Sequence, residues 1–294
     1  MTKNIKLARH AGFCYGVKRA VETTKKLKKE NPDREICVLG ELIHNSQVIK
    51  ELENLGIKTV DNLPDKGEGI CIIRSHGASL EVLKEIKDRG FEIVDLTCPD
   101  VKKVQNKAIE LADEGYFVII LGRPEHPEVM AISSNARAHA RSGDDVFVAK
   151  NIEALKEIEE KIKKHPKIGV VVQTTQRIEY LNEVLDYLAP ICKDLRVMNT
   201  ICASTSLRQN EAKTLAEESD LMVVVGSKKS ANTTHLAEIL CNITRTIHIE
   251  TDGELDSYKD IIEKAKNIGV TAGASTPDYI INKVIEKLSK GENK

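Results

Sequence analysis

Three cysteines, Cys14, Cys98 and Cys202, occupy the same point of a recurring sequence pattern. Each follows a short strand-like stretch and opens a helix-like segment, where the helix dipole and free N–H groups stabilise a thiolate. Separated thiolates are typical ligands of iron–sulfur clusters, and a cubane cluster usually takes four of them. A cubane held by three would leave one iron open to a substrate oxygen, like the open position of a catalytic zinc. The pattern therefore predicts a metal centre that reduces a small substrate.

The pattern alone leaves two other interpretations of these cysteines open. An isolated intracellular cysteine is commonly a small buried hydrophobic residue, and thiolates also bind zinc. The chain has seven cysteines and no CxxC pair, which disfavours a disulfide framework and a zinc ribbon. Cys37 and Cys71 lie in apolar stretches and are predicted to be core residues, and no role is assigned to Cys192 or Cys241.

Polar side chains follow the predicted strands at matching positions of the pattern. Taken singly, each is typical of a turn or a helix cap. Together they predict an anion site built from side chains and helix N-termini, with histidine adding a positive charge and a proton supply. The residues are His44, His76, His126, Thr174, Thr175, Ser230, Asn232 and Ser275.

Glu128 is the single acid at these loop positions. A carboxyl group in a closed cavity has a raised pKa and can deliver protons. The alternative is a solvent-facing glutamate in the first turn of a helix.

The elements around these residues repeat with a period of about 85 to 105 residues, longer than the repeats of solenoid proteins. Each unit is predicted to run helix, strand, loop, helix, strand, loop, helix, strand, which indicates parallel sheets in an α/β fold. The units are predicted at residues 14–97, 98–199 and 200–290, with residues 1–13 supplying the last strand of the third. Because ligands bind beyond the carboxyl ends of parallel strands, we expect a pseudo-threefold trefoil around a central cluster cavity.

Composition excludes several classes of function. Among 294 residues, 44 Lys and Arg balance 45 Asp and Glu, and there is no Trp. This disfavours nucleic acid as a partner, because neither a broad basic face nor a stacking platform is indicated. The start of the chain lacks the apolar run of a signal peptide, and the apolar runs are too short to span a bilayer. We therefore expect a cytoplasmic protein that binds no membrane.

Motifs along essentially the whole chain resemble those of 4-hydroxy-3-methylbut-2-enyl diphosphate reductase, the LytB/IspH family. They are, in order, GFCYGVKRAV, LIHNSQV, RSHG, LTCPDV, HPEV, QTTQ, TICASTSLRQ, GSKKSANT and GAST. The resemblance implies an oxidoreductase of isoprene biosynthesis, at the last step of the methylerythritol phosphate pathway. Its substrate would be an allylic diphosphate and its products isopentenyl and dimethylallyl diphosphate.

The resemblance also implies roles for single residues. Cys14, Cys98 and Cys202 match the ligands of a 4Fe–4S cluster whose fourth iron is open to substrate or water, and Glu128 matches the proton-delivering acid. His126 matches a histidine near the substrate that also contacts phosphate, and Thr174 with Thr175 matches a loop that positions the substrate hydroxyl and a water. The matched diphosphate-binding positions are His44, His76, Ser230, Asn232 and Ser275.

One residue departs from the family pattern. Ala231 stands where relatives often carry serine, so it offers a backbone N–H and no hydroxyl to the diphosphate. No flavin or nicotinamide motif is present, so ferredoxin or flavodoxin is the expected electron donor. Two alternative classes stay open: a non-enzymatic cluster protein that carries electrons or senses redox state, and a cluster-dependent hydro-lyase. The loop histidines and Glu128 disfavour a carrier, and only an assay separates a reductase from a lyase.

Overall fold

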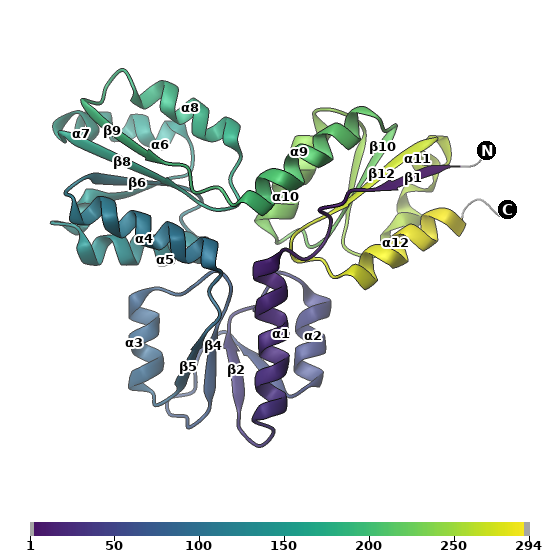
Figure 1. Cartoon of the computed structure of the whole chain (residues 1–294), viewed down its shortest axis with the longest axis horizontal. Helices are drawn as coiled ribbons and strands as arrows, with labels where there is room; N and C mark the ends of the chain where they lie inside the picture. Colours follow the sequence, from purple (N-terminus) through teal and green to yellow (C-terminus); the bar gives the residue numbers. More distant parts are fainter. Residues whose placement is uncertain (1–2, 291–294) are drawn as a thin grey trace. The chain divides into compact units, whose positions relative to one another are not determined.

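Three sheets, each of four parallel strands, form the framework of the chain (Figure 1). The structure is a computed structural model and describes residues 3–290. The first sheet has the order β3(Ile57–Val60), β2(Ile36–Leu39), β4(Ile70–Ile73), β5(Glu92–Asp95). The second has the order β7(Val146–Ala149), β6(Phe117–Leu121), β8(Lys167–Val172), β9(Asp194–Met198). The third has the order β11(Thr246–Ile249), β10(Leu221–Val225), β12(Asn267–Ala272), β1(Asn4–Leu7).

The same strand order recurs in all three sheets. β1 pairs with β12 at the place that β5 takes beside β4 and β9 takes beside β8. The N-terminal strand therefore sits in the third sheet, as the sequence predicts. The α/β class with three similar parallel-sheet units is confirmed.

Helices cover both faces of the second sheet, as its continuous apolar strands require. Successive side chains of a strand point to opposite faces. Phe117, Ile119 and Leu121 of β6 accordingly join the core beneath α6(Ile152–Glu157), α7(Glu159–Lys164) and α8(Ile178–Leu188). Val118 and Ile120 join the core beneath α4(Pro99–Asp113) and α5(Pro127–His139) (Figure 1).

The third sheet is built in the same way. Leu221, Val223 and Val225 of β10 pack with α11(Lys259–Lys264) and α12(Asp278–Lys290). Met222 and Val224 pack with α9(Ala203–Glu217) and α10(Ala231–Cys241). The remaining helices are α1(Tyr15–Glu30), α2(Ser46–Asn54), α3(Leu80–Asp88) and the 3₁₀ segments η1(Gly143–Asp145) and η2(Asp252–Tyr258).

Each sheet has one strand more than the sequence predicts. The extra strands β3, β7 and β11 are edge strands of four residues each. β3 reads IKTV, with Lys58 and Thr59 in its middle, so it lacks the continuous apolar run that marks the central strands. β11 reads TIHI and is also partly polar, whereas β7 reads VFVA and is apolar but only four residues long. Runs of four residues carry a weak signal in sequence, which is why these strands were not predicted.

The described chain divides into two compact units. One contains residues up to 19, residues 43–54 and residues from 203 onward, and so holds the third sheet. The other contains residues 20–42 and 55–202 and holds the first two sheets. The boundaries 14–97, 98–199 and 200–290 plus 1–13 stay a prediction, and residues 1 and 2 lie outside the described part. Within residues 3–290, no helix is both long and apolar enough to cross a bilayer.

Candidate active site

The three cysteines have equivalent backbone environments. Cys14, Cys98 and Cys202 directly precede α1, α4 and α9, and each side chain is partly exposed. Each backbone N–H donates to a carbonyl in the loop that follows the neighbouring strand. The acceptors are Ala274, Ser75 and Thr174, at N···O distances of 3.3, 2.9 and 2.9 Å. The three thiols therefore occupy corresponding helix starts, where a thiolate is electrostatically favoured.

A further contact fixes the Cys202 thiol. Its Sγ donates to Oδ2 of Asp100 at 2.9 Å, and Asp100 lies in the first turn of α4, which Cys98 caps. Asp100 was not among the predicted site residues, although it lies in the LTCPDV motif two residues after Cys98. Within this unit, the start of α4 and the loop before α9 lie together.

Glu128 is buried, with 1% of its surface exposed, in the first turn of α5. Its Oε1 accepts a hydrogen bond from the backbone N–H of Thr174 at 2.7 Å, and its Oε2 accepts one from the Thr174 hydroxyl at 2.8 Å. Burial disfavours the charged form and raises the pKa of Glu128 to about 7, although both hydrogen bonds from Thr174 act in the opposite direction. The alternative of a solvent-facing glutamate is therefore wrong.

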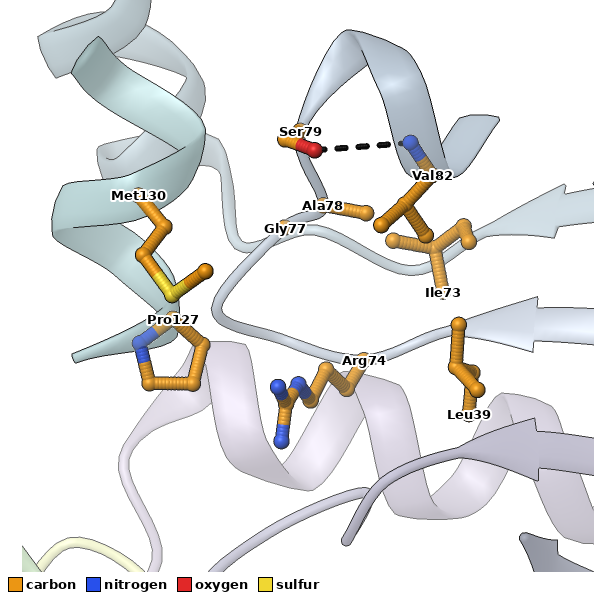
Figure 2. A pocket seen from close by; sticks show the side chains of 9 residues that line it. All are labelled: Leu39, Ile73, Arg74, Gly77, Ala78, Ser79, Val82, Pro127 and Met130. Carbon is orange, nitrogen blue, oxygen red and sulfur yellow. Dashed lines mark hydrogen bonds between the residues drawn. The ribbon is translucent and has the colours of Figure 1, made fainter. Parts of the chain in front are cut away.

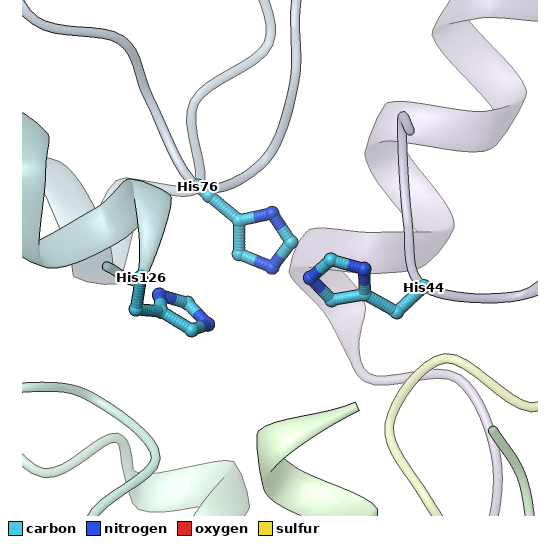
Figure 3. A group of neighbouring side chains, drawn as sticks. All are labelled: His44, His76 and His126. Atoms are coloured by element: carbon cyan, nitrogen blue, oxygen red, sulfur yellow. The ribbon is translucent and has the colours of Figure 1, made fainter. Parts of the chain in front are cut away.

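His126 caps the helix that carries Glu128. Its Nδ1 accepts a hydrogen bond from the Glu128 backbone N–H at 3.2 Å, so the neutral ring carries its proton on Nε2. The His76 ring meets the His126 ring edge to face, with centroids 5.3 Å apart and an interplanar angle of 89° (Figure 3). Thus the loops after β4, β6 and β8 bring His76, His126, Glu128 and Thr174 into one continuous set of contacts.

The loop before α10 presents a buried donor. Ser230 caps the helix, with its hydroxyl accepting from Thr233 N at 3.4 Å, and Ala231 and Asn232 form the buried first turn. Asn232 is 6% exposed, and its Nδ2 has no hydrogen-bond partner among the described residues. A buried donor without an acceptor is costly, so a ligand that accepts at this helix start would satisfy it. Anions are the natural ligands of such a position.

Glycines let the loops that follow β10 and β12 lie close to their neighbours. A Cβ on Gly273 would lie 1.9 Å from the Thr233 hydroxyl, and one on Gly226, at φ +142°, would lie 2.4 Å from the Thr276 hydroxyl. The loop after β12 therefore packs directly against the start of α10. This loop also carries Ser275, whose hydroxyl donates to the His44 carbonyl at 3.2 Å.

Thr175 faces a different partner from its neighbour Thr174. Its hydroxyl accepts a hydrogen bond from the Gln173 side chain at 3.2 Å. The side-chain Oε1 of Gln173 accepts from Arg123 N at 3.1 Å, which ties the loop after β8 to the loop after β6. Gln173 was not among the predicted site residues, and its place in the QTTQ motif is the signal in the sequence that marks it.

A small cavity is lined in part by Gly77 and Pro127, the residues that directly follow His76 and His126 in the chain. It has a volume of about 90 Å³, and its lining includes the side chains of Arg74, Ser79 and Pro127 and the backbone of Gly77 among apolar side chains (Figure 2). Desolvation lowers the pKa of Arg74, while nearby Glu41 acts against that shift. An engineered cavity of roughly 150 Å³ binds a molecule the size of benzene, and this cavity is smaller, so it is too small for an allylic diphosphate.

Comparison with known proteins identifies the family. The family model described as LytB protein matches residues 5–289. A relative from Syntrophotalea carbinolica, named 4-hydroxy-3-methylbut-2-enyl diphosphate reductase, is 45% identical over 285 residues, covering 96% of this chain and 97% of its own.

Two solved structures are similar along nearly the whole chain. One, described as (E)-4-hydroxy-3-methyl-but-2-enyl diphosphate reductase, the terminal enzyme of the non-mevalonate pathway, is 38% identical with a TM-score of 0.72. It covers 98% of this chain and 100% of its own. The other is the E-1-hydroxy-2-methyl-but-2-enyl-4-diphosphate reductase from Plasmodium falciparum, 26% identical with a TM-score of 0.86, covering 97% of this chain and 88% of its own. The chain belongs to the LytB protein family, a family of oxidoreductases.

Proposed function

We propose that this chain reduces (E)-4-hydroxy-3-methylbut-2-enyl diphosphate to isopentenyl and dimethylallyl diphosphate, the last step of the methylerythritol phosphate pathway. The substrate's C–O bond breaks, two electrons and two protons are taken up, and the oxygen leaves as water. The full-length relatives named as this reductase support the proposal. The observation that carries it is the buried Glu128 carboxyl group with a pKa of about 7, held by Thr174.

The donor set fits an iron–sulfur cluster. Cys14, Cys98 and Cys202 each offer a partly exposed thiol at a helix start, with matching backbone hydrogen bonds. We infer that they hold a 4Fe–4S cluster with one iron open to substrate or water. When bound, the cluster would supply electrons one at a time and a Lewis-acid position for the substrate hydroxyl.

Glu128 would deliver a proton to the leaving oxygen. A general acid works best when its pKa lies near the operating pH, and about 7 meets that condition. Thr174 holds the carboxyl group through both oxygens, so one residue fixes the orientation of the acid. Thr174 and Thr175 are proposed to position the substrate hydroxyl and a water, with His126 near the substrate.

The substrate diphosphate would bind at helix starts and histidines. Asn232 contributes an Nδ2 donor that lacks a partner among the described residues, and α10 contributes its N-terminal N–H groups. Ala231 adds only a backbone N–H to this set. The other proposed contacts are His44, His76, His126, Ser230 and Ser275.

Electrons are proposed to come from ferredoxin or flavodoxin, because reduction of the substrate needs an external donor.

Turnover tests the function directly. The protein is reconstituted anaerobically and supplied with the diphosphate substrate and a strong artificial reductant. We expect both products and no consumption of substrate without reductant. Water loss without reductant would indicate a hydro-lyase, and an intact cluster that leaves the substrate unchanged would indicate an electron carrier.

A further inference from the structure

The segment before Cys14 is longer than its counterparts. Residues 8–13 separate β1 from Cys14, whereas residues 96–97 separate β5 from Cys98 and residues 199–201 separate β9 from Cys202. A longer connection has more conformational freedom to lose when it is ordered. This segment therefore needs more restraint than the other two.

The two shorter segments are held by residues in strands of the sheet that each one follows. Thr97 N donates to the side chain of Asp95, at the end of β5, at 2.9 Å. The Thr200 hydroxyl bonds to both backbone groups of Val172 at 2.8 and 2.6 Å. Thr97 and Thr200 lie one and two residues before the cysteines that follow them.

The longer segment is held by α9, some 200 residues away in the chain. Oε1 of Glu211 accepts from Arg9 N at 2.7 Å, and its Oε2 accepts from His10 N at 2.8 Å. Two residues before Cys14, the Gly12 carbonyl accepts from Nη2 of Arg208 at 2.8 Å. One turn of one helix thus fixes three points along residues 8–13.

The Arg208 side chain is costly to place. It is 3% exposed and lies on the core-facing stripe of α9, where a charged group is disfavoured unless it is hydrogen-bonded. The positions six residues after Cys14 and Cys98 carry Ala20 and Val104, both 0% exposed. Corresponding helices of the same fold are therefore built with apolar residues here, so packing alone does not require arginine at this site.

The backbone at Gly12 is also fixed. Its φ is +90°, and a Cβ there would lie 3.1 Å from Oδ1 of Asp278 and 3.1 Å from the end of the Ile281 side chain. Glycine lets the chain turn at this point against α12. The Arg208 bond then holds the carbonyl of that turn, just before Cys14.

We propose that Arg208 and Glu211 are positioning residues that hold residues 8–13, and with them Cys14, in the cluster-binding conformation before the cluster is present. The inference rests on the proposed function, because it assigns the loop a purpose only if Cys14 is a ligand. It is tested first on the protein without iron, where the ligand role of Cys14 does not enter.

Hydrogen exchange of the iron-free protein measures the restraint. We expect amides of residues 9–14 in Arg208→Met and Glu211→Gln to exchange at least tenfold faster than in the wild type, with β10 and β12 unchanged. Arg208→Lys should restore much of the protection, because lysine can still donate to the Gly12 carbonyl. Lys107→Gln is the matched control, since Lys107 stands nine residues after Cys98 as Glu211 stands nine after Cys202, and it should leave residues 9–14 unchanged.

Cluster loading then tests the purpose of the restraint. After anaerobic reconstitution, Arg208→Met and Glu211→Gln should lose iron several-fold faster in air than the wild type, with Arg208→Lys in between. If Arg208→Met does not fold, Glu211→Gln decides, because the Glu211 side chain is 24% exposed and its loss disturbs no core. Wild-type exchange and iron retention in Glu211→Gln and in every folded Arg208 variant would overturn the inference. A wild type that binds no iron, with fast exchange in the variants, would instead overturn the proposed function.

Discussion

Thr174 donates to both carboxylate oxygens of Glu128, through its backbone N–H at 2.7 Å and its hydroxyl at 2.8 Å. One residue thus controls both the orientation of the carboxyl group and the balance between its charged and neutral forms. Burial raises the pKa and these two bonds lower it, which leaves it at about 7. The group can therefore hold a proton and release it near neutral pH.

Glu128→Gln should bind a normal amount of iron and lose most turnover. General acid catalysis contributes on the order of 100-fold or more to a rate, so we expect at least that loss in kcat. Glu125→Gln is the control, because Glu125 is exposed in the loop that directly precedes α5. Iron content and turnover with an artificial reductant are measured on both variants. Unchanged turnover in Glu128→Gln would remove the acid role.

The stability of the iron-free protein should depend on the same group. The folded pKa of Glu128 is raised, so its neutral form is favoured in the folded state. Its contribution to stability is complete below the unfolded value of 4.5 and is lost as pH rises through about 7. The change amounts to roughly 3 kcal/mol of unfolding free energy, from 1.36 kcal/mol per unit.

Glutamine is uncharged like the neutral carboxyl group and does not titrate, so the unfolding free energy of Glu128→Gln should not fall in this way as pH rises. Urea unfolding at pH 5 and pH 8 measures it in both proteins. Relative to the wild type, the variant should be more stable at pH 8 than at pH 5. An equal stability difference at both values would contradict a raised pKa.

Thr174→Val should move the pH dependence of turnover. The variant keeps the backbone N–H bond and loses the hydroxyl bond, which favours the charged carboxylate. The pKa of Glu128 should then rise, and the loss of kcat/KM at alkaline pH should begin at a higher value. Thr175→Val serves for comparison, because the Thr175 hydroxyl pairs with Gln173. If kcat/KM of Thr174→Val began to fall at the same pH as in the wild type, or at a lower pH, this would contradict a hydrogen bond between the Thr174 hydroxyl and the Glu128 carboxylate.

Asn232→Leu should affect stability and binding in opposite directions. Without ligand, the variant removes a buried donor that lacks a partner among the described residues, so its melting temperature should equal or exceed that of the wild type. Inorganic pyrophosphate should raise the melting temperature of the wild type and not that of the variant. Asn210→Leu, at an exposed position of α9, is the control. A wild-type pyrophosphate response in Asn232→Leu would remove Asn232 from the diphosphate site.

Local pattern predicted the parts of the fold that depend on burial. β6, β8, β10 and β12 are almost fully buried, so their apolar runs were plain in the sequence, and the cysteines and polar loops follow strand ends as expected. Contacts between distant loops could not be predicted in this way. Thr174 meets Glu128 across 46 residues, and Arg208 meets Gly12 across 196. Sequence periodicity marks which face of a helix is buried. It does not show which backbone carbonyl will accept a hydrogen bond from a buried arginine.

Iron bound by single cysteine variants tests the central claim most directly. Each of Cys14, Cys98 and Cys202 is changed to serine, and Cys241→Ser is the control, because Cys241 is an exposed residue at the end of α10. After anaerobic reconstitution, iron and sulfide are measured per chain. The wild type and Cys241→Ser should each hold about four iron and four sulfide ions, the content of a cubane cluster, and each of the three other variants should hold much less. A normal iron content in any of those three would show that the cysteine is not a ligand, and an iron-free, colourless wild type would contradict the account as a whole.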